Sequence, residues 1–121
     1  MIEVKKMKLR PAALLLPLAL ATVACAPQSP QEQQADQIRD QADAQGDAIE
    51  AAAANQAAQM EEQAATLTNQ AGTSQGFDAQ RINVRAEALR KEAELIKEQA
   101  EARAKAVRDQ GEAQASAVLA K

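Results

Sequence analysis

The sequence predicts an all-α fold of two long, alanine-rich amphipathic helices, about residues 30–71 and 79–120, paired as an antiparallel helical hairpin or coiled coil. The first observation behind this prediction is the scarcity of large apolar side chains. Only thirteen follow residue 25, too few to fill a compact globular core. The second is the abundance of alanine, which is the best helix former. The third is that the larger apolar residues recur at helical spacing, so the chain should form extended helices.

The first 24 residues are interpreted as a signal peptide. Four bases, Lys5, Lys6, Lys8 and Arg10, precede an apolar stretch over 12–23 of the length expected for a secretory signal. A stable membrane span needs about 20 apolar residues, so this stretch is too short to be one. Translation could start at Met1 or at Met7, and the interpretation of the leader is the same for both.

Cys25 ends this leader and is the only cysteine in the chain. Residues 21–26 (ATVACA) resemble the lipobox of bacterial lipoproteins, in which a small residue precedes the cysteine that becomes the lipidated N-terminus. The resemblance implies cleavage between Ala24 and Cys25, acylation of Cys25, and membrane lipid as a partner. Thr22 departs from the lipobox pattern, where a Leu-like residue is usual. Cleavage at an ordinary signal site, with free secretion, is therefore the alternative.

The same resemblance predicts a location. Ala26 stands where an aspartate would disfavour onward transport, so we expect the protein to be anchored in the outer membrane, facing the periplasm. The inner membrane is the alternative.

The first helix should begin after a short linker, residues 25–29. Ser29, Pro30 and Glu32 form a capping box with proline at the first helical position. The helix is predicted to run to residue 71, with Gly72 as its left-handed C-terminal residue and a loop over 72–78. Gly46 is the weak point inside it.

The second helix should begin at residue 79, with Asp78 as its N-cap and Phe77 packed on Ile82 as a hydrophobic staple. It is predicted to run to about residue 120, with Gly111 as a soft spot.

Two predicted helices of 42 residues each and a short loop favour a hairpin in which facing residue numbers sum to about 150. Charge supports this pairing, because residues 30–71 carry a net charge of −7 and residues 79–121 a net charge of +2. Asp43 should then lie near Val107 and Arg108, and Asp47 near Arg103. The alternative is two solvated charged helices that never meet.

The larger apolar residues recur every eleven residues in two phases: Ile38, Ile49, Met60, Ala71 and Ile82, then Ile96, Val107 and Val118. Eleven residues over three turns keep such a stripe on one side of a nearly straight helix. A heptad-like spacing joins Ile82, Ala86, Leu89, Ala93, Ile96 and Ala100. We interpret the stripe as a seam for another helix. A face lying on a membrane and the drift of a low-complexity sequence are the alternatives; membrane-surface helices usually carry aromatic residues, and Phe77 is the only one here.

The composition argues against several classes of function. The chain has no histidine, tyrosine or tryptophan, and its carboxylates are expected on open helical faces, so we predict no catalytic, cofactor-binding or metal site and no enzyme activity. From residue 25 onward ten bases stand against sixteen acids, so we predict no nucleic-acid partner either.

Signal, cysteine, short linker, alanine-rich helix and terminal lysine together resemble the small alanine-rich lipoproteins of Gram-negative outer membranes, of which the murein lipoprotein is the best known. That resemblance implies a site at Lys121 for covalent linkage to peptidoglycan. The chain departs from the family in its length, its break at 72–76 and its ending in VLAK. A closed hairpin would also return Lys121 to the lipid end of the molecule, which argues against this linkage.

A non-enzymatic, lipid-anchored helical lipoprotein with a structural or helper role through helix–helix contacts is therefore the leading hypothesis. A second copy of the chain and an envelope protein are its candidate partners. Residues 85–106 also resemble the C-terminal helices of membrane scaffold proteins such as prohibitins. The competing hypothesis is a peripheral membrane-binding or stress-protective protein, similar to apolipoprotein-like and desiccation-protein eleven-residue repeats.

Overall fold

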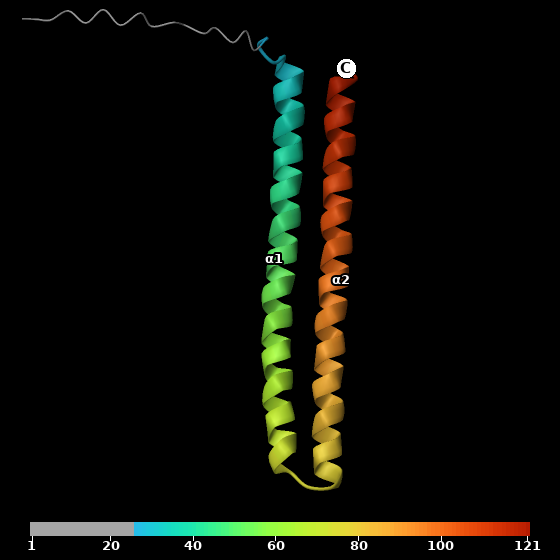
Figure 1. Cartoon of the computed structure of the whole chain (residues 1–121). Coiled ribbons are helices and arrows are strands. Elements are labelled where there is room, and N and C mark those ends of the chain that lie inside the picture. Colours follow the sequence, from blue (N-terminus) through green and yellow to red (C-terminus); the bar gives the residue numbers. More distant parts are fainter. Residues whose placement is uncertain (1–25) are drawn as a thin grey trace, which may run out of the picture.

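The computed structural model describes residues 26–121, which form two helices. Helix α1 spans Pro30–Thr73 and helix α2 spans Phe77–Leu119, with 44 and 43 residues. They lie side by side in opposite directions along their whole length (Figure 1). The predicted all-α hairpin is confirmed. The signal peptide and the cleavage and lipidation sites, Ala24 and Cys25, lie outside the described residues.

The start of α1 agrees with the sequence in detail. The backbone N–H of Glu32 donates to Ser29 Oγ at 3.2 Å, and the Ser29 N–H donates to Glu32 Oε2 at 2.8 Å. This reciprocal capping box satisfies two backbone donors that have no partner inside the helix. Pro30 occupies the first turn, where its missing N–H is not needed.

The turn between the helices is shorter than predicted. Gly72 does not end α1, which continues to Thr73 with Ser74 as its C-cap. The hydroxyls of Thr73 and Ser74 each donate to the Gln70 carbonyl at 2.9 Å, so these side chains satisfy a terminal carbonyl without a left-handed glycine. The one positive φ in residues 26–121, +63°, is at Gly76, where the chain reverses.

Gly76, not Asp78, is therefore the N-cap of α2. Phe77 becomes the first helical residue and is 73% exposed, so it does not pack as the predicted staple. The prediction placed the cap two residues late because an aspartate side chain is the stronger cap signal in a sequence, whereas the reversal itself needs a residue that tolerates positive φ.

The contact between the helices is built from the smallest side chains. Every buried residue in 26–121 is alanine or glycine: Ala35, Ala42, Gly46, Ala53, Ala57, Ala64 and Ala71 on α1, and Ala86, Ala93, Ala100, Ala104, Gly111 and Ala115 on α2. We call this set the alanine seam. Its members are mostly seven and four residues apart, which is the predicted eleven-residue period, and their small size lets the two backbones approach closely.

The predicted apolar stripe does not form the contact between the helices. Ile38, Ile49 and Met60 are not the seam but lie beside it, half-buried. A seam of alanine cannot accommodate these longer side chains at the same height without separating the helices. The heptad-like set is confirmed, since Ala86, Ala93 and Ala100 are buried and the intervening Ile82, Leu89 and Ile96 are half-buried.

The register of the hairpin is fixed near its open end. Gly111 lies so close to Ala42 that a β-carbon added at Gly111 would collide with the β-carbon of Ala42. A β-carbon at Gly46 would lie 2.8 Å from Arg108 Nε. Of the two glycines predicted to be weak points, Gly111 thus lies where the helices approach each other closely, and Gly46 makes room for the Arg108 guanidinium.

Candidate functional site

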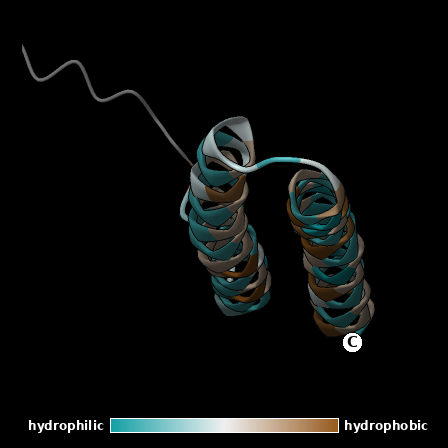
Figure 2. Ribbon diagram, turned by 90° about the horizontal axis from the view of Figure 1, so that it is seen from below, coloured by the Kyte–Doolittle hydropathy of each residue, from teal (hydrophilic) through white to brown (hydrophobic). Residues whose placement is uncertain are grey.

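The hairpin is a layer one helix thick and two helices wide, with two broad faces of different chemistry, one on each side of the alanine seam. The charged face carries the ion pairs between the helices. The aliphatic face carries half-buried apolar residues of both helices: Ile38, Ile49, Met60 and Leu67 on α1, and Ile82, Leu89, Ile96, Val107 and Val118 on α2. Neither helix is hydrophobic all round, as the mixed colouring in Figure 2 shows.

Arg108 is the centre of the charged face. From α2 its guanidinium donates to Glu50 Oε1 at 3.0 Å and to Asp47 Oδ1 at 2.8 Å, and its Nε lies 3.8 Å from Asp43 Oδ1. The guanidinium occupies the space above Gly46, where a side chain would displace it. The predicted proximity of Asp43 to Arg108 is confirmed. The predicted neighbour of Asp47 is wrong, because Asp47 pairs with Arg108 instead of Arg103. Arg103 lies on the aliphatic side with Ile49 and Ile96, whereas the Arg108 guanidinium reaches from Asp43 to Glu50 along α1.

Three further contacts cross the charged face. Arg39 donates to both carboxylate oxygens of Glu112, at 2.8 and 3.0 Å. Lys97 Nζ lies 2.7 Å from Glu61 Oε1. Closer to the turn, Arg90 donates to the Thr68 hydroxyl at 2.9 Å. These contacts pair the helices in one register, with residue numbers summing to 151–158.

Hydrogen bonding shifts the titration of these groups toward their charged forms. The bonds from Arg108 lower the pKa of the Glu50 carboxyl, and the bonds from Arg39 lower the pKa of the Glu112 carboxyl. The same pairs raise the pKa of both arginines. An acid or base poised near neutral pH for catalysis requires the opposite arrangement, so the charged face is suited to holding two helices together.

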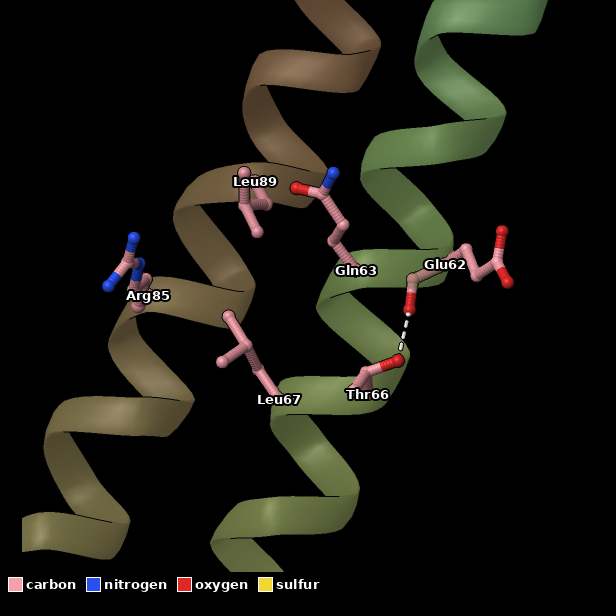
Figure 3. A pocket seen from close by; sticks show the side chains of 6 residues that line it. All are labelled: Glu62, Gln63, Thr66, Leu67, Arg85 and Leu89. Carbon is pink, nitrogen blue, oxygen red and sulfur yellow. Dashed lines mark hydrogen bonds between the residues drawn. The ribbon is translucent and has the colours of Figure 1, made fainter.

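The aliphatic face is a row of shallow depressions between the helices. Ile38 and Val107 line one of them, Ile49 and Ile96 the next, and Leu67 and Leu89 a third near the turn. Figure 3 shows Leu67 and Leu89 turned toward the space between the helices with Gln63 beside them, while the Glu62 carboxylate points away. The Glu62 carbonyl accepts a hydrogen bond of 3.0 Å from the Thr66 hydroxyl.

Glutamines border this face. The depressions are lined by Gln41, Gln45, Gln56, Gln63 and Gln70 on α1, and by Gln99, Gln110 and Gln114 on α2. Glutamine both donates and accepts hydrogen bonds and carries no charge. The acids of α1 that pair across the hairpin are on the opposite face. This glutamine border was not predicted from the sequence, although the recurrence of glutamine beside the apolar repeat was a signal for it.

The remaining sites named from the sequence are not brought together. Lys121 is exposed and lies at the end of the hairpin where α1 begins (Figure 1). Among residues 26–121 no three acidic, histidine or cysteine side chains are placed to hold a metal ion. Neither helix in that range combines the length and apolarity needed to cross a membrane.

No protein-family model, no curated protein and no solved structure matches this chain.

Proposed function

We propose that this chain is a lipid-anchored, non-enzymatic helical lipoprotein of the bacterial cell envelope that acts structurally, or as a helper, through helix–helix contacts. The observation that carries the proposal is the placement of its only cysteine, Cys25, at the end of a basic and then apolar leader, directly before a rigid helical hairpin. Only four residues, 26–29, separate Cys25 from the start of α1. Acyl chains on Cys25 would hold one end of the hairpin at a membrane surface.

The shape of the hairpin supports a structural role. Each helix is about 66 Å long at the helical rise of 1.5 Å per residue. The described residues bury only small side chains, and most of their ion pairs join the two helices. Such a molecule offers long surfaces to other helices. The site of its proposed anchor and its two faces are then its functional parts.

The decisive experiment follows Cys25 in cells. The full chain should take up a labelled fatty acid and fractionate with membranes, and Cys25→Ala should abolish labelling and leave uncut precursor or soluble protein. Thr22→Leu, which restores the usual lipobox residue, is the matched control and should label at least as well as the natural chain. Unchanged mass and fractionation of Cys25→Ala would remove the anchor from the proposal.

In this proposal Lys121 is not a wall anchor. The C-terminus lies beside the start of α1, hence next to the proposed lipid (Figure 1), whereas linkage to peptidoglycan requires it to reach away from the membrane. Purified sacculi boiled in detergent and digested with muramidase should release no Lys121-linked muropeptide. Release of such a species would favour the murein-linked alternative and require the hairpin to open.

Circular dichroism separates the proposal from a peripheral membrane protein that folds on lipid. The seam and the ion pairs lie within the chain, so helicity should be the same with and without anionic vesicles. Helicity that appears only with vesicles would favour the membrane-binding alternative.

A further inference from the structure

We propose that the aliphatic face binds the same face of a second copy of this chain, forming a four-helix bundle in which α1 of each copy packs on α2 of the other. This inference deepens the proposed function and rests on its helix–helix contacts, because it names their surface and their partner. The acyl chain itself is not needed for it.

The first argument is the incomplete core of the hairpin. The described residues contain no large side chain that is fully buried, and the seam consists of alanine and glycine alone. The half-buried Ile, Leu, Val and Met residues of the aliphatic face follow both helices from the open end to the turn. A second aliphatic face laid against them would supply the layer of large apolar side chains that a helical bundle normally has at its centre.

The second argument is area. A strip about 66 Å long and about one helix diameter wide, 10–12 Å, covers about 700 Å². A standard stable interface buries about 800 Å² on each partner. The aliphatic face is therefore long enough for a specific dimer.

The third argument is charge, which selects a second copy over lipid. The depressions of this face are lined mainly by apolar side chains and glutamines, with two acids, Glu62 and Asp78, and three bases, Arg81, Arg85 and Arg103. All three arginines are on α2, so when α2 packs on α1 of a second copy they meet the glutamines and Glu62 of that α1 and not one another. Facing glutamine side chains can also form hydrogen bonds with one another. An anionic membrane is a poorer partner, because the aliphatic face has no aromatic residue, its three arginines are accompanied by two acids, and acids outnumber bases in residues 26–121 as a whole.

Charge also selects the orientation. Helix α1 carries eight acids and one base, a net charge of −7, whereas α2 carries eight of each and is neutral. If the copies were stacked with opposite ends together, the acidic α1 would lie on the acidic α1 of the partner. If equal ends lie together, α1 lies on the neutral α2 of the partner. Two copies anchored in one membrane would also have equal ends together.

This geometry makes a specific prediction about neighbours. Ala42 faces Gly111 within the hairpin, so at equal height Met60 of one copy lies within one helical turn of Ile96 of the other. The test co-expresses two full-length chains, Met60→Cys and Ile96→Cys, and treats intact cells with a short bis-maleimide. Each chain has one cysteine in its helices, so a link between positions 60 and 96 must join two copies.

The matched control uses the adjacent residues. Glu61 lies on the charged face and Leu95 is 55% exposed, so neither belongs to the proposed interface. We expect a several-fold excess of 60–96 dimer over 61–95 dimer, with the linked peptides identified by mass spectrometry. A second pair, Ile49→Cys with Val107→Cys, should behave like 60–96 and guards against local misfolding. The natural chain measures any background from Cys25.

Each other outcome overturns the proposal. Equal yields from both pairs indicate random collision. Links mainly between two copies of position 49, which lies near the middle of α1, indicate the opposite orientation. A cysteine at position 60 that resists maleimide yet gives no dimer indicates that lipid or another protein covers the face. Acylation of Cys25, read from the mass of the same samples, reports independently on the proposed function, so the two can fail separately.

Discussion

The charged and aliphatic faces lie on the same two helices, at the same heights, and use opposite chemistry. On the charged face Arg108 reaches three carboxylates, so its contacts are completed within the chain. On the aliphatic face Leu89 and Ile96 meet residues of α1 only along one side and are left half-exposed. The charged face therefore helps to hold the two helices together, whereas the aliphatic face has apolar surface left for contact with other molecules. Changes in the seam and in each face should therefore have separable effects.

The largest effect is expected in the seam that both faces share. Gly111→Ala adds one methyl group where the Ala42 β-carbon already lies, so the helices must separate at their closest contact. We expect the free energy of unfolding to fall by about 1–3 kcal/mol, the usual cost of overpacking, although alanine is the better helix former. Thermal unfolding of the purified full chain, followed by circular dichroism, measures the change.

Two other glycines supply the controls for this prediction. Gly72 has open space around it, so Gly72→Ala should raise stability by about 0.5–1 kcal/mol through helix propensity alone. Gly46→Ala meets only the guanidinium of Arg108, which can move, and should fall between the two. A stabilising Gly111→Ala would show that the helices are not in close contact at Ala42.

The second prediction concerns the aliphatic face. Ile96→Ser removes a half-buried apolar side chain and should cost about 1 kcal/mol in an isolated hairpin. Leu95→Ser is the adjacent control on the exposed side of α2 and should change stability by less than about 0.5 kcal/mol. A dimer through this face would add a dependence on protein concentration to the Ile96→Ser effect. Equal effects of the two substitutions would remove the distinction between the aliphatic face and open surface.

These two predictions also mark what the sequence could and could not reveal. Local chemistry and helix length were enough to predict the two helices, the capping box at Ser29 and the approximate register in which the helices pair. Which residues form the seam did not, because period alone cannot tell whether Ile49 or Ala53 faces the partner helix when both repeat every eleven residues. That choice depends on how closely two backbones approach, which is a tertiary property.

The predictions for the turn and for the partner of Asp47 were wrong for similar reasons. Gly72 and Asp78 carry strong local signals, but the hydroxyls of Thr73 and Ser74 and the positive φ of Gly76 decided the turn. Arg103 was predicted as the neighbour of Asp47 from residue numbering alone, but an arginine side chain extends several residues along the facing helix, and Arg108 reaches Asp47. The proposed lipidation of Cys25 is argued from the sequence, since Cys25 lies outside the described residues.

The third prediction tests that corrected register. Arg108→Gln removes the guanidinium shared by Glu50, Asp47 and Asp43 and should lower the melting temperature. Arg103→Gln makes the same chemical change on the aliphatic side, where Arg103 lines a depression, and should lower it less. Added salt should narrow the difference because it screens exposed pairs. A larger loss in Arg103→Gln would restore the pairing of Asp47 with Arg103 and shift the helices by about one turn.

The smallest effect is expected from pH. Glu50 and Glu112 have pKa values lowered in the folded chain by their arginine partners, from an ordinary value of 4.5. Their contribution to stability is therefore present above that value and is lost as the pH falls through the lowered folded-state pKa values. The melting temperature should drop between neutral pH and about pH 3.

The double variant E50Q/E112Q is the control. Its melting temperature should be lower at neutral pH and should fall less on acidification. Acid also relieves repulsion within α1, whose net charge is −7. The contribution of the two ion pairs is therefore measured as the difference in pH dependence of the melting temperature between the natural chain and the variant. Parallel pH profiles for the two would mean that these ion pairs do not hold the helices together in solution, leaving the alanine seam to close the hairpin alone.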